Sequence, residues 1–182
     1  ESGTNNGLAA TLYILALPGS TYMFQGEELG LHEVTDIPEK DIQDPQYLRN
    51  HRVDKGRDGC RVPMPWTSEG SSYGFGPGGA HLPQPDWFKN ENVEVQNRDE
   101  GSSLNLYRLA LAIRKQLQTE ESLIWIKHFG GNVLHFRRPN GWECFTNFGS
   151  KPVKLPAGRV ILSTNKIVDG RVPANTTLWL QR

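Results

Sequence analysis

Apolar residues gather in one compact run near the start of the chain. The segment GLAATLYILAL, residues 7–17, is apolar almost throughout, and Asn5 and Asn6 directly before it are residue types that commonly cap helices. A Pro-Gly pair, which ends helices, follows the run. The pattern predicts a buried helix capped by these asparagines. The next apolar run, STYMFQ at residues 20–25, is rich in β-forming residues and predicts a buried strand.

Regular periodicity is then lost over residues 27–99. This stretch holds most of the prolines and the glycine-rich run GSSYGFGPGGAHLPQP, with room for one short helix around IPEKDIQDP. A structureless stretch of such length is unusual inside a compact domain and is usually functional. We therefore expect a long functional loop after the predicted strand.

A second helix is predicted after this loop, with Ser102 or Ser103 as its cap. The apolar residues recur at helical spacing: Leu106, Leu109, Ala110, Ile113 and Leu117. Beyond residue 119, short and partly alternating segments are separated by turns such as GGN, PNGW and DGR. This pattern predicts an antiparallel β domain, a small sandwich or barrel, and we place the domain boundary between residues 1–119 and residues 120–182.

Aromatic and histidine positions in the β domain allow a finer prediction. Trp125, Trp142 and Trp179 stand on predicted strands, and large aromatic residues in a small β domain usually form its core. His135 alternates with apolar neighbours, so we expect its side chain to point outward.

The order of elements predicts the fold class. A helix, a tight turn, a buried strand, a long loop and a helix form a βα unit with a helix before it. We interpret residues 1–119 as the last βα unit of a (β/α)8 TIM barrel, an α/β fold, and residues 120–182 as a C-terminal antiparallel β-sandwich. Such a barrel needs about 250 residues, so we expect its other units upstream, and its active site on the face formed by the loops after the strands.

Composition excludes several partners and cofactors. The chain has 182 residues, with 20 basic and 20 acidic side chains, so neither nucleic acid nor an anionic membrane is an expected partner. No apolar run reaches the length of about 18 residues that suggests a membrane span. Cys60 and Cys144 are far apart and the histidines show no ligand spacing, so we expect two free thiols, a cytoplasmic protein, and no metal or cofactor.

Candidate chemistry concentrates in the segment KGRDGCRVPMPW, residues 55–66. Arg57 and Arg61 offer fixed forks of N–H donors that suit carboxylates or sugar hydroxyls, and Asp58 can orient such a fork. Prolines stiffen the segment. The alternative is a salt bridge that only pins the long loop in place, and the spacing of the residues leaves both interpretations open.

Other polar residues have equally open roles. Glu27 and Glu28 follow the predicted strand, where two carboxylates serve either as an acid–base pair or as caps of the chain. His51 with Asp54 suggests acid–base chemistry, although a single loop histidine is more often plain surface. Trp87 either packs the loop or stacks on a sugar.

Several motifs in the same order carry a resemblance to a known family. The segments are LALPGSTYMFQGEELGL, IPEKDIQDP, GRDGCRVPMPW, LPQPDWF, NVEVQNRD and SLNLYRLALAIRKQL, and the resemblance covers about residues 5–118. They resemble the C-terminal third of a bacterial α-glucosidase of the α-amylase superfamily, glycoside hydrolase family 13, in its α-glucosidase and oligo-1,6-glucosidase branch. The resemblance implies retaining hydrolysis of α-linked glucose by two aspartates and a glutamate that lie upstream of the QGEELG segment. We therefore expect no catalytic residue in this chain, and no activity from the chain alone.

The resemblance also implies a substrate-binding role for the arginine segment. It places Arg57 at the glucose pocket, where it partners an upstream aspartate and binds hydroxyls of the non-reducing sugar, with Arg61 as the second candidate. Val62 stands where related enzymes usually carry threonine, which removes a hydroxyl from the loop. The implied partners are a small oligosaccharide and the rest of the barrel. A non-catalytic amylase-like partner protein, and a transglycosylase or sugar isomerase of the same family, remain alternatives.

Overall fold

The computed structural model of the chain describes residues 2–127 and 132–182. The chain divides into two compact units. The first, which we call the helix–sheet unit, contains the residues up to Met23 together with Leu106–Arg182. The second, the loop unit, contains Phe24–Asn105.

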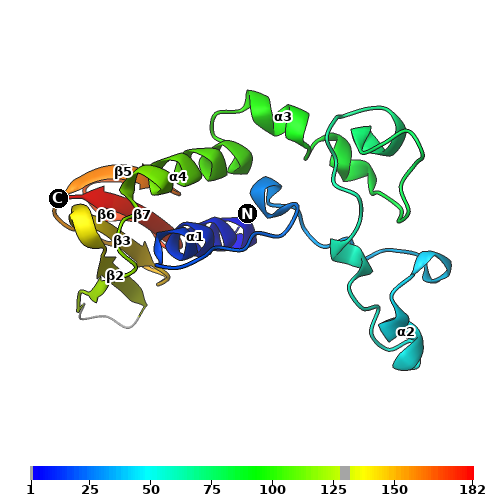
Figure 1. Cartoon of the computed structure of the whole chain (residues 1–182), viewed down its shortest axis with the longest axis horizontal. Coiled ribbons are helices and arrows are strands. Elements are labelled where there is room, and N and C mark those ends of the chain that lie inside the picture. The colour runs from blue at the N-terminus through cyan, green and yellow to red at the C-terminus, as the bar shows by residue number, and fades with distance from the viewer. Residues whose placement is uncertain (1, 128–131) are drawn as a thin grey trace. The chain divides into compact units, whose positions relative to one another are not determined.

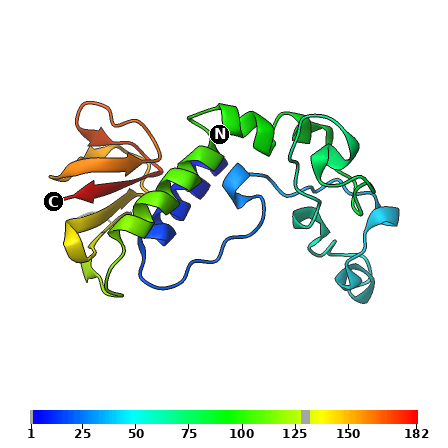
Figure 2. The same ribbon diagram turned by 45° about the horizontal axis from the view of Figure 1, so that its top comes forward.

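The helix–sheet unit combines two long helices with antiparallel strands. Helix α1 (Ser2–Ala16) and helix α4 (Ser103–Leu117), whose residues from Leu106 onward belong to this unit, run side by side along the sheet in both views (Figures 1 and 2). The main sheet has five strands in the order β1-β2-β3-β7-β5, and β4 pairs with β6 in a separate two-stranded sheet. The strands are β1 (Ile124–Trp125), β2 (Val133–Arg137), β3 (Trp142–Asn147), β4 (Val153–Lys154), β5 (Arg159–Ser163), β6 (Arg171–Val172) and β7 (Thr176–Gln181).

The central strands of the sheet are buried on both faces. Successive side chains of a strand point to opposite faces, and all six residues of β3 are buried. Trp142 and Trp179 pack with Leu12 of α1 and Ala110 of α4 on one face. On the other face, a second cluster includes Val172 of the small β4–β6 sheet. The sheet is therefore covered by helices on one side and by a β ribbon on the other.

Side chains from three elements hold helix α1 through its backbone carbonyls. Thr177 Oγ1 donates to the carbonyl of Ala9 at 2.6 Å, and Trp179 Nε1 donates to that of Leu12 at 3.0 Å. At the end of the helix, Arg114 and Arg138 donate to the carbonyls of residues 15 and 16 at 2.6 and 2.9 Å. The last carbonyls of a helix have no partner within it, so the two arginines satisfy groups that would otherwise be unpaired.

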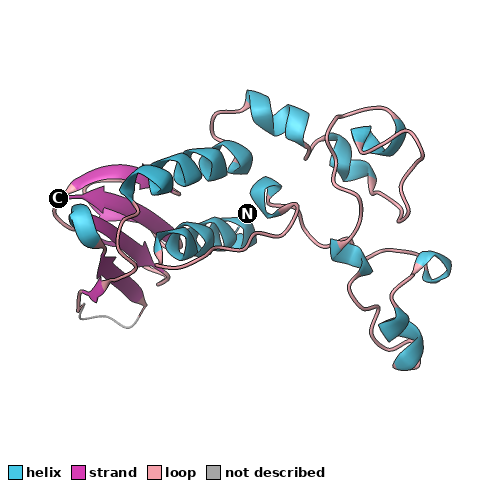
Figure 3. Cartoon of the chain, in the orientation of Figure 1, coloured by secondary structure: helices cyan, strands magenta, loops and turns pink. Residues whose placement is uncertain are grey.

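The loop unit has little regular secondary structure but a core of its own. Figure 3 shows mainly loops between short helices in this part of the chain. Its α-helices are α2 (Pro45–Arg49) and α3 (Val93–Arg98). Its 3-10 helices are η1 (Glu27–Leu29), η2 (Glu39–Asp41), η3 (Asp58–Cys60), η4 (Ser71–Gly74) and η5 (Asp86–Lys89). The buried cluster consists of Val34, Ile37, Val62, Leu82 and Phe88. The predicted long loop is thus a compact unit, and the short helix expected around residues 37–45 is present as η2 and the start of α2.

Two predictions about the first segment are wrong. Helix α1 begins at Ser2, so Asn5 and Asn6 lie within it rather than at its cap; packing of its apolar face against the sheet outweighs the preference of a cap residue. Residues 20–25 form no strand, and the side chains of Tyr22 and Phe24 are 93% and 51% exposed. An isolated strand leaves its N–H and C=O groups unpaired, and the described chain brings no partner strand beside this segment.

The predictions for helix α4 are mostly confirmed. Ser102 caps the helix, because its Oγ accepts a hydrogen bond from the N–H of Asn105 at 3.2 Å. Ala110 is buried, and Leu106, Ile113 and Leu117 pack against the same cluster. Leu109 is the exception at 50% exposed, because the covered stripe of the helix is narrower than the apolar pattern suggests.

The core of the β domain is predicted correctly in part. Trp142 and Trp179 are fully buried, as expected. Trp125 is 56% exposed, because β1 is an edge strand; its ring forms a T-shaped contact with Phe136, with centroids 5.5 Å apart. The outward orientation expected for His135 is wrong as well, since His135 is 3% exposed and bonds a carboxylate on the neighbouring strand.

Two further predictions concern domains and membranes. The boundary proposed between residues 119 and 120 lies inside the helix–sheet unit, whose limits follow packing rather than chain order, and it stays a prediction. None of the helices in the described part of the chain has the length and apolar character that crossing a membrane requires.

Candidate functional site

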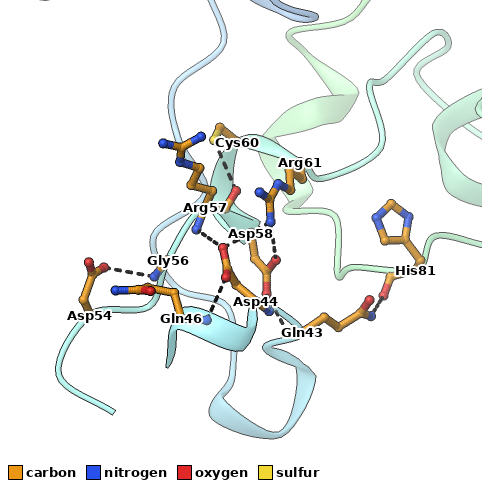
Figure 4. A network of polar contacts seen from close by, with 10 residues as sticks. All are labelled: Gln43, Asp44, Gln46, Asp54, Gly56, Arg57, Asp58, Cys60, Arg61 and His81. Atoms are coloured by element: carbon orange, nitrogen blue, oxygen red, sulfur yellow. Dashed lines mark hydrogen bonds and ion pairs between the residues drawn. The ribbon is translucent and has the colours of Figure 1, made fainter. Parts of the chain in front are cut away.

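The arginine segment is organised around two aspartates of the loop unit (Figure 4). Asp58 begins helix η3 and is 4% exposed. Its Oδ2 accepts hydrogen bonds from the backbone N–H groups of Gln43 and Asp44, the latter at 2.8 Å. Asp58 therefore joins the arginine segment to the chain that precedes α2.

Asp44 is the second organising residue. Its Oδ1 accepts from the N–H of Gln46 at 2.9 Å and so caps helix α2. Its Oδ2 accepts from the backbone N–H of Arg57 at 2.8 Å and from Nη1 of Arg61 at 3.1 Å. The backbone hydrogen bonds from Gln46 and Arg57, together with the charge of Arg61, hold the pKa of Asp44 below its ordinary value. Asp44 thus carries a negative charge at neutral pH, beside the backbone of Arg57 and the guanidinium of Arg61.

The two candidate arginines have different environments. Arg61 pairs with Asp44 at 3.1 Å and approaches Asp58 at 3.8 Å. Arg57 is exposed, and the described residues provide no hydrogen-bond or ion-pair partner for its guanidinium group, which points away from both carboxylates in Figure 4. The salt bridge that pins the loop is therefore made by Arg61, while the fork of Arg57 remains unoccupied.

Both arginines line a shallow polar pocket. The pocket has a volume of about 410 Å³. Its walls are formed by Asp44, Gln46, Asp54, Gly56, Arg57 and Arg61. The formal charges of its two aspartates and two arginines cancel, so the pocket is polar without a net charge. Such a lining suits a neutral ligand that is rich in hydroxyl groups.

Glycines allow the close approach of these segments. Gly56 has φ of +74°, and a Cβ atom there would lie 2.5 Å from Cγ of Asp44. A Cβ at Gly59 would lie 2.5 Å from the backbone oxygen of Val34. Any larger residue would therefore push the arginine segment away from Asp44 or from the core.

Val62 lies in the core rather than at the pocket. Its side chain is 6% exposed and belongs to the buried cluster of the loop unit. The pocket walls do not include it. The methyl group that replaces a threonine hydroxyl here consequently faces apolar neighbours.

The other candidate residues have structural roles. Glu27 accepts from the N–H of Phe24 at 3.1 Å, and Glu28 accepts from that of Gly26 at 2.9 Å, so both carboxylates cap the local turn. Trp87 packs against Phe88 with ring centroids 4.5 Å apart, which favours the packing interpretation.

His51 and Asp54 are not brought together as an acid–base pair. His51 is exposed in the turn after α2 with φ of +59°. Asp54 instead accepts from the N–H of Gly56 at 2.9 Å. No hydrogen bond joins His51 to Asp54 in the part of the chain that the structure describes.

Thiols and possible metal ligands are the remaining reactive groups. Cys60 and Cys144 are free, as predicted, and burial raises the pKa of the Cys144 thiol. Over residues 2–127 and 132–182, no group of three or more histidine, cysteine, aspartate or glutamate side chains is placed to hold a metal ion.

The role of Asp44 was not predicted from the sequence. The Asp44-Pro45 pair is readable as a helix start, with aspartate as the cap and proline in the first turn. Nothing in the local sequence indicates that the same carboxylate also meets Arg57 and Arg61, which follow 13 and 17 residues later.

Comparison with known proteins identifies the family. The model of the α-amylase catalytic domain matches residues 3–121. A probable α-glucosidase of Rhizobium meliloti is 34% identical over 153 residues, which cover 81% of this chain and 27% of that protein. A probable oligo-1,6-glucosidase of Bacillus subtilis is 35% identical over 126 residues, covering 60% of this chain and 22% of that protein.

A solved structure extends the similarity to the whole chain. The crystal structure of the α-glucosyl transfer enzyme XgtA matches with a TM-score of 0.77 and 30% identity, over 98% of this chain and 36% of that chain. The predicted fold class, the C-terminal part of a barrel followed by a β-rich domain, is thereby confirmed, and the chain spans about a quarter to a third of the length of such relatives. The chain belongs to the α-amylase family, glycoside hydrolase family 13.

Proposed function

We propose that the full-length protein is a retaining α-glucosidase that removes terminal α-linked glucose from maltose-type or isomaltose-type oligosaccharides. The curated relatives named as a probable α-glucosidase and a probable oligo-1,6-glucosidase support this activity. In this proposal, the present chain supplies one wall of the glucose pocket, and the rest of the barrel supplies the others. The two free thiols support a cytoplasmic location, which remains part of the proposal.

The observation that carries the proposal is the exposed guanidinium of Arg57 at a polar pocket that it shares with Asp44 and Arg61. An arginine fork presents several N–H donors in a fixed plane, and sugar hydroxyls accept such hydrogen bonds. The pocket around Arg57 has no formal net charge, which favours a neutral sugar over a phosphorylated one. We assign direct sugar binding to Arg57 and a supporting role to Arg61.

The catalytic carboxylates belong to the upstream part of the protein in this proposal. Retaining hydrolysis needs a nucleophilic carboxylate and an acid about 5 Å apart across the glycosidic bond. Glu27 and Glu28 are engaged with backbone N–H groups, so we assign neither of them a catalytic role. The isolated chain should therefore show no turnover of a chromogenic α-glucoside.

Replacing Arg57 by alanine in the full-length protein tests the proposal. We expect kcat/KM on maltose or isomaltose to fall by about tenfold or more, because binding contacts to the transition state are lost. Arg98→Ala serves as the matched control, since Arg98 is exposed and pairs with Glu94 on helix α3. A change below about threefold for Arg57→Ala would remove Arg57 from the sugar pocket.

Glucosyl transfer to an acceptor other than water is the second candidate function. Its support is the similarity to the α-glucosyl transfer enzyme XgtA, at 30% identity over nearly the whole chain. Products formed from concentrated maltose distinguish the two activities. Glucose alone supports hydrolysis, and trisaccharides in the early products support transfer.

A further inference from the structure

Asp44 occupies the point where helix α2 meets the arginine segment. Its carboxylate accepts hydrogen bonds from three groups, the N–H of Gln46, the N–H of Arg57 and Nη1 of Arg61. Its side chain is 10% exposed. We propose that Asp44 is a positioning residue for sugar binding, because it holds the backbone of Arg57 and the side chain of Arg61 and thereby fixes where the Arg57 guanidinium meets the substrate.

The hydrogen bond between Asp44 and the N–H of Arg57 fixes the backbone position from which the Arg57 side chain extends. The N–H of Arg57 lies 2.8 Å from Oδ2 of Asp44. Gly56, directly before Arg57, is held with a positive φ of 74° that glycine adopts without strain. A shift of the backbone by about 1 Å at this point would move the guanidinium out of reach of a fixed hydroxyl.

The same carboxylate oxygen holds both arginines. Oδ2 of Asp44 accepts from both Arg57 N and Arg61 Nη1, which uses both of its lone pairs. Oδ2 of Asp58 is used in the same way by two backbone N–H groups. Loss of the Asp44 oxygen as an acceptor would therefore release the Arg57 backbone and the Arg61 side chain together.

An asparagine substitution separates this role from helix capping. Asparagine caps helices about as well as aspartate, so Asp44→Asn keeps the bond from Gln46 to one oxygen. Its amide NH₂ group then faces the N–H of Arg57 and the guanidinium of Arg61. All three groups are hydrogen-bond donors, so the two hydrogen bonds to Asp44 Oδ2 are lost. The variant should keep the stability of α2 and lose the hold on the arginine segment. Asp44→Ala removes both.

The inference rests on the proposed function, and a double-mutant cycle in the full-length protein tests both. Asp44→Asn is made in the wild-type protein and in Arg57→Ala, and kcat, KM and the binding constant for glucose are measured for all four proteins. Asp99→Asn is the matched control, because Asp99 also accepts the N–H of the residue two positions later, at 2.9 Å, but is exposed and lies outside the pocket walls.

We expect Asp44→Asn to raise KM and weaken glucose binding about tenfold in the wild-type background and less than about twofold in Arg57→Ala, because the two residues act through one contact. The thermal midpoint should stay close to that of Asp99→Asn. Equal losses in both backgrounds, or no loss at all, would overturn the positioning role. If Arg57→Ala itself leaves binding and kcat/KM unchanged, the proposed function of Arg57 fails instead, and the positioning role fails with it.

Discussion

The two units of this chain satisfy their buried polar groups in different ways. In the helix–sheet unit, regular helices and an antiparallel sheet pair most backbone groups, and large aromatic side chains fill the space between them. In the loop unit, side chains bind many of the backbone groups instead. Asp58 accepts two backbone N–H groups, and the amide of Asn92 donates to two carbonyls.

This difference shows that a charged residue in an irregular segment should not be assigned a catalytic or binding role before its backbone hydrogen bonds are known. A polar side chain in the loop unit is first a candidate for hydrogen bonding to backbone N–H and C=O groups, because no β-sheet pairs these groups there. Asp44, Asp58, Glu27 and Glu28 all serve in this way. The functional candidate is Arg57, whose exposed side chain lines the pocket, whereas these carboxylates bind backbone N–H groups.

Removing a large core residue from the helix–sheet unit should have the largest effect on stability. Trp179 is fully buried and also donates to the carbonyl of Leu12. We expect Trp179→Ala to lower the free energy of unfolding by about 4 kcal/mol, from the cavity and the lost packing. Trp125→Ala is the control, since Trp125 is 56% exposed, and it should cost about 1 kcal/mol or less. Urea unfolding followed by circular dichroism measures both, and similar losses for the two variants would contradict the assigned core.

The next effect concerns the buried carboxylate of the sheet. Glu143 has no exposed surface and is bonded by Nε2 of His135 at 2.9 Å, by Arg137 at 2.7 Å and by Arg182 at 2.8 Å. Glu143→Gln leaves these donors without their counter-charge, and we expect a loss of about 3 kcal/mol in unfolding free energy. The matched change in the loop unit, Glu94→Gln, disrupts an exposed pair with Arg98 and should cost about 0.5 kcal/mol.

The dependence on pH sharpens this prediction. Burial alone would raise the pKa of Glu143, but hydrogen bonds from Arg137 and His135 and the charge of Arg182 hold the pKa below its ordinary value of 4.5. A group with a lowered pKa stabilises the fold above its ordinary value, and this contribution is lost as the pH falls through the lowered value. The stability difference between wild type and Glu143→Gln should therefore shrink as the pH falls below about 4.5. A difference that stays unchanged at pH 3 would contradict this account.

A smaller effect is expected from the polar anchor of the loop unit. Asn92 is fully buried, caps helix α3 through the N–H of Val95 at 3.0 Å, and donates to the carbonyls of Phe88 and Lys89. We expect Asn92→Ala to cost about 2 kcal/mol, because a cap and two buried acceptors lose their partner. Asn92→Asp keeps the cap but turns a buried carboxylate oxygen toward these two carbonyl oxygens, so its thermal midpoint should fall at least as far as that of alanine. A neutral alanine variant would show that the loop unit does not depend on side chains for its backbone pairing.

Local patterns were enough to predict several elements. The Pro-Gly pair after residue 17 correctly predicts the end of α1, and the helical spacing correctly predicts α4. Alternating segments beyond residue 119 correctly predict antiparallel strands. These features depend on residues that are close together in the sequence. Motif order, in the same way, was sufficient to indicate the family.

Predictions that depended on distant partners were less successful. Residues 20–25 have the composition of a strand, but the described chain contains no neighbour to pair with them. His135 reads as an outward residue until Glu143 on the next strand is placed beside it. The sequence predicts that Trp125 belongs to the core, but the strand order places β1 at the edge of the sheet.

The amino-acid sequence by itself determined the family, the two long helices, the antiparallel strands that follow them, and the presence of two arginines in a rigid segment. Only the tertiary structure decided that Arg61 is held by carboxylates and that Arg57 is not, because Asp44 and Arg61 meet across 17 residues of chain. Short-range preferences are encoded in neighbouring side chains. The ion-pair partner of a charged side chain depends on the fold. Folding brings charged groups that are distant in the sequence close together, so that each gives up bound water and pairs with the other.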